Sequence, residues 1–220
     1  LFTFLQGRQM PFIIATNNAT KSPRDYQQKL AQHGVEISEN RILTAGVATA
    51  LYLQKELKPG AKIYMIGQSA LKSALLEAGF KLIPDATEDV TAVVVGGDSN
   101  LTYEKLKNAT LLLQRGAQFI GTNPDVVYPT EEGFIPETGA TLAALQAATG
   151  VKSTVIGKPE PYLFDLAITR LGSDPAQTAV IGDRLETDIL GGHRAGLKTI
   201  LTTTGIDNET TILEKNIHPD

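Results

Sequence analysis

Cysteine is absent from this chain of 220 residues. Disulfide bonds and cysteine-ligated metal sites are therefore excluded, which fits a reducing compartment such as the cytoplasm. No apolar run approaches the roughly 18 residues of a membrane-spanning helix, so we expect no membrane contact. Lysine and arginine are fewer than aspartate and glutamate, which leaves a formal net charge of -4. A nucleic-acid binder usually carries a basic surplus, so we expect no nucleic-acid partner.

One long segment also lacks cationic side chains. Between Gly116 and Val151 there is no lysine or arginine, whereas acidic residues occur at Asp125, Glu131, Glu132 and Glu137. A lysine or arginine would be the natural partner of an additional anionic group on a ligand. The segment therefore offers no side-chain cation to a doubly charged ligand.

Apolar runs of strand type alternate with segments of helical periodicity along the whole chain. The expected strands are residues 11–16, 42–44, 62–66, 92–95, 118–121, 154–156, 179–181 and 198–201. The expected helices are residues 22–34, 48–57, 69–78, 102–115, 140–148, 161–171 and about 186–195, with a turn over 122–125 and a long loop from there to Thr138. This alternation is typical of parallel sheets with crossover helices. The predicted fold class is therefore α/β, with a Rossmann-like parallel-sheet core.

Two turn-rich breaks, at residues 58–60 and 150–152, divide the chain. The piece between them has strands and helices of its own. We predict an α/β domain of residues 60–152 inserted into a core formed by residues 1–59 and 153–220, because insertion at exposed turns is well tolerated. A cleft between two such domains is a natural ligand site.

Three polar residues follow expected strands at their carboxyl ends: Thr16, Lys158 and Asp183. In an open α/β sheet, ligands bind just outside these ends. The Thr16 hydroxyl and the backbone amides of Asn17 and Asn18 suit a phosphate oxygen, and Lys158 supplies a cation for the same group. Simpler interpretations also exist, since Thr16 can merely end a strand and Lys158 can be an exposed turn lysine.

Acidic residues follow the strand that ends near Ile181. Asp183 would hold a hard divalent cation, most simply Mg²⁺, or cap the next helix; both roles are compatible through different oxygens. Glu186 is interpreted as an acid that stabilises the first helical turn. Asp188 is either another such acid or a residue that hydrogen-bonds the metal's water. These groups form the electrostatic half of a phosphoryl-transfer site.

Three segments resemble, in chain order, motifs of the haloacid dehalogenase-like (HAD) superfamily of phosphatases. Residues 15–20 are similar to the family's second motif, 157–159 to its third and 182–188 to its fourth. The insertion resembles the type-two cap, and residues 121–125 with 136–140 resemble the cap loop of the p-nitrophenyl phosphatase and N-acetylglucosamine-operon phosphatase branch. The resemblance implies a HAD-like core and Mg²⁺-dependent hydrolysis of small phosphomonoesters through an aspartyl-phosphate. It assigns catalysis to Thr16 and Lys158, phosphate or substrate binding to Asn17, Asn18, Asn123 and Asp125, and the metal site to Asp183 with Asp188 behind it.

The family's first motif, an apolar strand ending in Asp-x-Asp, occurs nowhere in the 220 residues. Its two aspartates are the family's nucleophile and general acid–base. Because the chain begins at Leu1 and residues 1–9 read as the second half of a helix, we expect this strand to precede Leu1. We also expect the chain alone to be inactive. The alternative is a phosphate- or nucleotide-binding module without catalysis. A receiver-type domain also uses Asp, Thr, Lys and Mg²⁺, but the long insertion and the paired asparagines argue against it.

The expected cap leaves two further alternatives open. Asn123 and Asp125 are either plain turn formers or substrate contacts, and the resemblance favours contact. With no cation in this segment, doubly anionic substrates such as phosphoglycolate are expected to be poor. The Ala-rich helix over 140–148 either packs inside its own domain or contacts a second copy in a homodimer.

Overall fold

The computed structural model describes residues 1–220, which form two compact units. The smaller unit contains residues 1–15 and 158–220, and the larger unit contains residues 16–157. None of the helices combines the length and the apolar character that crossing a membrane requires.

These units differ from the predicted domains at one boundary. The later boundary falls after Gly157, close to the predicted one, but residues 16–59 group with the larger unit. The reason is local packing: α3 (Ala45–Glu56) lies against α4 (Ser69–Glu77). In addition, the Gln54 side chain donates a hydrogen bond to the Ala78 carbonyl. The division into a core and an inserted domain stays a prediction.

The larger unit is built on a five-stranded parallel sheet in the order β4-β3-β5-β6-β9. Along the register, Met65 lies opposite Val94, and Val94 lies opposite Ile120. The parallel α/β architecture predicted from the sequence is confirmed. The strands are β3 (Lys62–Ile66), β4 (Lys81–Leu82), β5 (Ala92–Val95), β6 (Gln118–Gly121) and β9 (Thr154–Val155).

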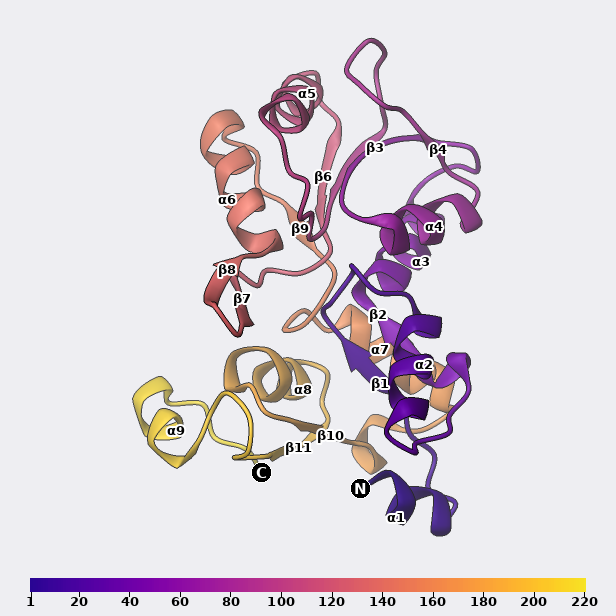
Figure 1. Cartoon of the computed structure of the whole chain (residues 1–220), viewed down its shortest axis with the longest axis vertical. Coiled ribbons are helices and arrows are strands. Elements are labelled where there is room, and N and C mark those ends of the chain that lie inside the picture. Colours follow the sequence, from indigo (N-terminus) through magenta and orange to yellow (C-terminus); the bar gives the residue numbers. More distant parts are fainter. The chain divides into compact units, whose positions relative to one another are not determined.

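Helices cover both faces of this sheet (Figure 1). On one face α5 (Tyr103–Gln114) and α6 (Thr138–Thr149) bury alternate strand residues. On the opposite face lie α3 and α4. Because β5 is covered on both faces, all four of its residues are buried. A strand in this position reads as a continuous apolar run in the sequence.

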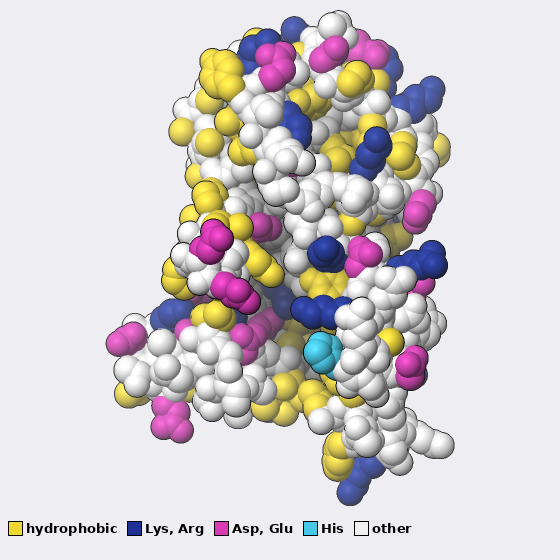
Figure 2. Space-filling view, viewed as in Figure 1, with side chains coloured by type: hydrophobic (Ala, Val, Ile, Leu, Met, Phe, Trp, Pro, Cys, Tyr) yellow, Lys and Arg dark blue, Asp and Glu magenta, His cyan; other side chains and the backbone are white.

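The segment predicted as a long loop contains an antiparallel hairpin of β7 (Val127–Thr130) and β8 (Gly133–Pro136). The prediction of a long loop from the turn at 122–125 to Thr138 was therefore wrong over the hairpin. Prolines at positions 129 and 136 argue against a strand, and every residue of both strands is exposed, so no alternating pattern marks them. Hydrophobic and acidic side chains gather together over the hairpin (Figure 2).

The other elements of the larger unit begin with clear sequence signals. Ser22 and Asp25 form a capping box that starts α2 (Pro23–Gln32). The Thr44 hydroxyl accepts a hydrogen bond from the Val47 amide, so α3 starts three residues before the predicted position. Between them lie a short 3-10 turn (Glu39–Arg41) and β2 (Ile42–Thr44).

The smaller unit contains β10 (Ala179–Gly182), paired in parallel with β11 (Lys198–Leu201). Phe164, Ile168 and Leu197 form its core, with Val180 packed against them. A Cβ on Gly192 would lie 2.5 Å from the Val180 side chain, so the helix can approach the strand only with glycine there. The helices are α1 (Phe2–Gly7), α7 (Tyr162–Leu171), a π-helical turn (Leu185–Ile189) continuing into α8 (Leu190–Arg194), and α9 (Glu209–Lys215), while β1 (Ile14–Thr16) crosses the unit boundary.

Candidate functional site

Lys158 and Asp188 form an ion pair inside the smaller unit. The ammonium Nζ of Lys158 lies 2.7 Å from Asp188 Oδ1 and 3.1 Å from the carbonyl oxygen of Ala15, the residue before Thr16. The two side chains are only 12% and 8% exposed. Three segments that the sequence placed at strand ends therefore meet here. The interpretation of Lys158 as an exposed turn lysine is wrong.

The second oxygen of Asp188 holds the loop after β10. Asp188 Oδ2 accepts hydrogen bonds from the backbone amides of Asp183 and Arg184, at 3.2 and 3.1 Å. A Cβ on Gly182 would lie 2.3 Å from the Asp188 Cβ, so glycine makes this approach possible. One carboxylate thus orients both the lysine and the loop. The predicted hydrogen bond between Asp188 and a metal-bound water stays a prediction.

The carboxylate of Asp183 is itself oriented by the chain. Its Oδ2 accepts a hydrogen bond from the Ile206 amide at 3.1 Å, and its carbonyl oxygen accepts one from the Asp207 amide at 3.0 Å. Arg184, not Asp183, precedes the helical turn, and no side chain caps it. The N-cap interpretation of Asp183 is therefore wrong. Glu186 does lie in the first turn, as predicted, and its exposed carboxylate pairs with Lys215.

Sequence reasoning missed Asp207, whose carboxylate is almost fully buried. Its Oδ2 accepts a hydrogen bond from the Leu185 amide at 2.8 Å, and its Oδ1 lies 3.0 Å from the Lys215 ammonium. Burial alone would raise the pKa of Asp207, but the Leu185 amide and Lys215 together hold that pKa below its ordinary value. The pKa of Lys215 is raised, first by its hydrogen bond to Glu186. An isolated acid between Ile206 and Asn208 carries no sequence signal of this role.

In the larger unit, the residues after β1 form a closed local network. Thr16 Oγ1 accepts a hydrogen bond from the Asn18 amide at 3.2 Å. Asn18 Oδ1 accepts from both the amide and the hydroxyl of Thr20, at 2.7 and 2.8 Å. Tyr26 also bonds to Thr16 and Asn18, and burial raises its pKa. Because the Asn18 amide already has an internal partner, phosphate binding at this turn stays a prediction.

Asn123 and Asp125 hold the loop after β6 to Asn17. The side-chain Nδ2 of Asn17 donates to Asp125 Oδ2 at 3.0 Å, and the side-chain Nδ2 of Asn123 donates to the backbone carbonyl of Asn17 at 2.8 Å. Asn123 Oδ1 accepts from the Asp125 amide, the bond of an Asx turn. The turn-forming interpretation is confirmed for Asn123, which is 1% exposed. The contact of Asn123 with a substrate stays a prediction.

Glu137 lies beside the same turn; the sequence marked it only as one of the acidic residues in a segment without lysine or arginine. The Thr138 hydroxyl donates to Glu137 Oε1 at 3.1 Å. A Cβ on Gly97 would lie 2.8 Å from that oxygen and 3.0 Å from the methyl group of Thr20. Gly97 follows β5 and Asn123 follows β6. An acidic group therefore stands at the carboxyl edge of the sheet, where α/β proteins bind ligands.

The arrangement of the acidic side chains can be compared with the ligands that the expected Mg²⁺ needs. No group of three or more His, Cys, Asp or Glu side chains in the chain is arranged to hold an ion. Mg²⁺ is commonly bound through one or two carboxylates while it keeps several waters. Asp183, with one oxygen held by Ile206, fits as a single oxygen ligand of such an ion.

Known protein families and individual proteins are similar to this chain in sequence. Family models described as haloacid dehalogenase-like hydrolase and HAD-hydrolase-like match residues 1–81 and 155–220. The acid sugar phosphatase of Staphylococcus haemolyticus is 40% identical over 216 residues, covering 98% of this chain and 81% of that protein.

Two solved structures show the same fold. The p-nitrophenyl phosphatase of Archaeoglobus fulgidus aligns with a TM-score of 0.93 and 33% identity, over 99% of this chain and 84% of that one. The glycerol phosphate phosphatase of Mycobacterium tuberculosis, in complex with magnesium, aligns with a TM-score of 0.88 and 32% identity, over 94% and 62%. The chain belongs to the haloacid dehalogenase-like hydrolases, in the branch of p-nitrophenyl phosphatases and acid sugar phosphatases.

Proposed function

We propose that this protein hydrolyses small phosphomonoesters with the help of Mg²⁺. The observation that carries the proposal is the contact of Lys158 with both Asp188 and the Ala15 carbonyl, because it joins the three family motifs inside the chain. The relatives act on esters of this kind by name: acid sugar phosphatase, p-nitrophenyl phosphatase and glycerol phosphate phosphatase.

Each residue has a proposed part in the reaction. Lys158 neutralises charge on the transferring phosphoryl group, and Thr16 with Asn17 and Asn18 supplies donors to its oxygens. Asp183 holds Mg²⁺, which when bound stabilises negative charge on phosphoryl oxygens. Asp188 keeps Lys158 and the Asp183 loop in place. Fixed cations and donors around the phosphoryl group are the main source of catalysis in such reactions.

The nucleophile is proposed to come from outside these 220 residues, because no Asp-x-Asp occurs in them. The open side of β10 supports this. β10 pairs only with β11, so one hydrogen-bonding edge of β10 has no neighbouring strand. A strand that ends in the nucleophilic aspartate would use the unpaired edge of β10.

The codons upstream of Leu1 and the activity of the full gene product test this proposal. We expect an in-frame Asp-x-Asp, phosphate release from p-nitrophenyl phosphate by the full product, and none from the 220-residue chain. The full product with Lys158→Met should lose turnover. A start codon at Leu1, together with an inactive full product that still binds inorganic phosphate, would instead support the non-catalytic binding module. Turnover by the 220-residue chain itself would refute the external nucleophile.

The cap segment is proposed to disfavour leaving groups that carry a second negative charge. Glu137 places a carboxylate beside the Thr20 side chain, Asp125 places another on Asn17, and no lysine or arginine lies between Gly116 and Val151. Repulsion between like charges at a binding site costs free energy and therefore selects against such substrates. Neutral sugar phosphates and polyol phosphates are the expected substrates.

Glu137→Gln in the full gene product tests this selectivity. The ratio of kcat/KM for phosphoglycolate to kcat/KM for glucose 6-phosphate should rise about tenfold, since one repulsive charge is removed. Glu132→Gln, in the hairpin turn, makes the same charge change away from the Thr20 side chain and should alter the ratio by less than about twofold. Equal effects of the two variants, or a wild-type preference for phosphoglycolate, would contradict the proposed selectivity against a second negative charge.

Self-association through the cap is also proposed. Leu142 and Leu145 of α6 pack inside the larger unit, whereas Ala143, Ala144 and Ala147 are exposed. Ordinary internal packing thus accounts for one side of the helix and leaves the Ala-rich side available for a second copy. Sedimentation velocity of the full product at several concentrations would show a dimer, or a monomer if the helix only packs internally.

A further inference from the structure

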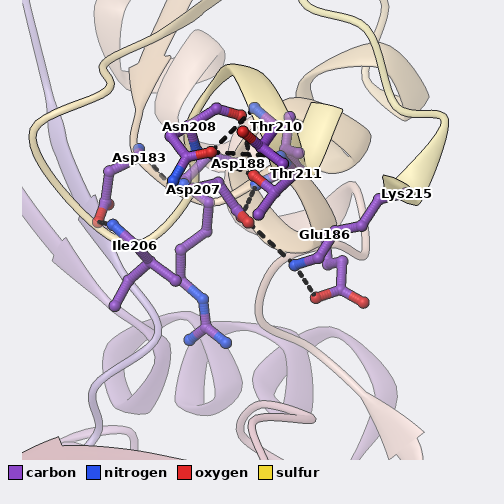
Figure 3. A network of polar contacts seen from close by, with 11 residues as sticks. Asp183, Glu186, Asp188, Ile206, Asp207, Asn208, Thr210, Thr211 and Lys215 are labelled. Carbon is purple, nitrogen blue, oxygen red and sulfur yellow. Dashed lines mark hydrogen bonds and ion pairs between the residues drawn. The ribbon is translucent and has the colours of Figure 1, made fainter. Parts of the chain in front are cut away.

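The segment after β11 folds back onto the segment after β10 (Figure 3). The Thr202 amide donates to the Gly182 carbonyl at 2.8 Å. Four residues later, the Ile206 amide donates to Asp183 Oδ2 and the Asp207 amide to the Asp183 carbonyl. A Cβ on Gly205 would lie 2.1 Å from Asp183 Oδ2, so the approach needs glycine. The returning segment is therefore in direct contact with the carboxylate of Asp183.

The Asp207 side chain fastens this returning segment from the other side. Its carboxylate is 3% exposed and accepts hydrogen bonds from the Leu185 amide and the Lys215 ammonium. Leu185 begins the helical turn just after Asp183, whereas Lys215 ends α9. Asn208, next along the chain, caps α9 through the amides of Thr210 and Thr211. Asp207 thus connects the loop of Asp183 to a capped helix.

We propose that Asp207 is a positioning residue that holds the Asp183 carboxylate in the orientation needed to bind a divalent cation. The metal-binding half of this inference rests on the role proposed for Asp183. Without the bond to Leu185, the Ile206 and Asp207 amides lose their fixed place against Asp183, and its carboxylate becomes free to rotate. Partners that orient a metal ligand typically change metal affinity by about 10- to 100-fold.

The alternative is that Asp207 serves only to pair with Lys215. The chain offers a control for it, because Lys215 also pairs with Glu186, which is 60% exposed. Glu186→Gln removes a carboxylate from Lys215 but leaves the Asp207–Leu185 bond intact. Asp207→Asn removes the charge at the buried end of the same network. The two variants separate positioning of the loop from neutralisation of the lysine.

The experiment uses the full gene product and two measurements. Amide hydrogen exchange at Leu185 and Ile206 reports the order of the loop in the absence of metal. Binding of Mn²⁺, followed by its electron paramagnetic resonance signal, reports the ligand, since carboxylate sites that suit Mg²⁺ also suit Mn²⁺. Asp207→Asn should speed exchange at both amides and weaken Mn²⁺ binding, each about tenfold or more. Glu186→Gln should change both by less than about twofold.

Unchanged exchange and unchanged Mn²⁺ affinity in Asp207→Asn would overturn the proposal, as would equal effects of the two variants. If Asp207→Asn does not fold, Lys215→Met serves as the second variant. It removes one of the two groups that hold Asp207, so exchange at Leu185 should rise, and no rise would overturn the proposal. If the wild-type full product binds no Mn²⁺, the role of Asp183 fails separately, and exchange at Ile206 still decides whether Asp207 orders the loop.

Discussion

The Lys158 ammonium lies 2.7 Å from Asp188 Oδ1, while the other oxygen of the same carboxylate accepts two backbone amides of the loop after β10. Both side chains are mostly buried. A buried pair of charges contributes less to stability than its short distance suggests, because both ions lose hydration. Its value here is geometric: one carboxylate holds the cation and the candidate metal ligand in a fixed relation.

Replacement of Asp188 by alanine should destabilise the protein strongly. The variant leaves the buried Lys158 ammonium without this carboxylate and two loop amides without their acceptor. Loss of one partner of a buried pair typically costs about 3–5 kcal/mol. Urea unfolding of the 220-residue chain would measure it. Glu160→Ala, which breaks the exposed pair with Arg194, should cost about 1 kcal/mol or less, and a similar cost for both variants would contradict the buried role.

Gly182→Ala should lower the stability of the protein although it adds only one methyl group. The new Cβ would lie within 2.3 Å of the Asp188 Cβ and within 2.5 Å of its Oδ2. Overpacking of this kind typically costs about 1–3 kcal/mol, and displacement of Asp188 should also disturb Lys158. Gly46→Ala is the matched control: its nearest neighbour, Ala19 Cβ, is 3.6 Å away, and alanine favours the helix. Thermal unfolding should show a lower Tm for the first variant and an equal or higher Tm for the second.

Asn123→Ala should reduce stability even in the absence of substrate. The Asn123 side chain is buried and bonds to the Asn17 carbonyl, the Asp125 amide and the Thr138 hydroxyl. Leaving buried polar partners unsatisfied typically costs about 1–3 kcal/mol each. Chemical unfolding compared with Asn100→Ala, an exposed asparagine, would show the difference. A loss of substrate affinity with no loss of stability would instead support direct substrate contact.

The capping box of α2 should make part of the stability depend on pH. The Ser22 amide and hydroxyl both donate to Asp25, and these bonds hold the pKa of Asp25 below its ordinary value of 3.8. A depressed pKa in the folded state contributes stability above the unfolded pKa, and this contribution is lost as pH falls through the folded value. The Tm difference between wild type and Asp25→Asn should therefore shrink between about pH 4 and about pH 2.

A double-variant cycle checks that this pH dependence comes from the box. Ser22→Ala removes the side chain that accepts from the Asp25 amide and should cost about 1 kcal/mol at neutral pH. Ser22→Ala combined with Asp25→Asn should cost less than the two single changes added together, because both act on one interaction. If the free-energy costs of the two changes simply add, the effect of Asp25 does not come from the capping box.

Elements with a local signal were predictable from the sequence. The strands at 42–44, 62–66, 92–95, 118–121 and 198–201 have the predicted bounds, because strands buried on both faces or bounded by turns read as apolar runs. The exposed hairpin of β7 and β8 has no such run and was missed. The turn before α8 is π-helical, which depends on a shared acceptor at Arg184 that no spacing of residues indicates.

By itself, the sequence determined the α/β class, the motif residues Thr16, Lys158 and Asp183, and the absence of cysteine and of an Asp-x-Asp nucleophile, because each is written in residue identity and short spacing. Only the tertiary structure decided which partners these residues have. Lys158 meets Asp188 across 30 residues, Asn17 meets Asp125 across 108, and Leu185 meets Asp207 across 22. Such contacts arise when packed elements bring distant segments together, and burial then requires each polar group to find a partner.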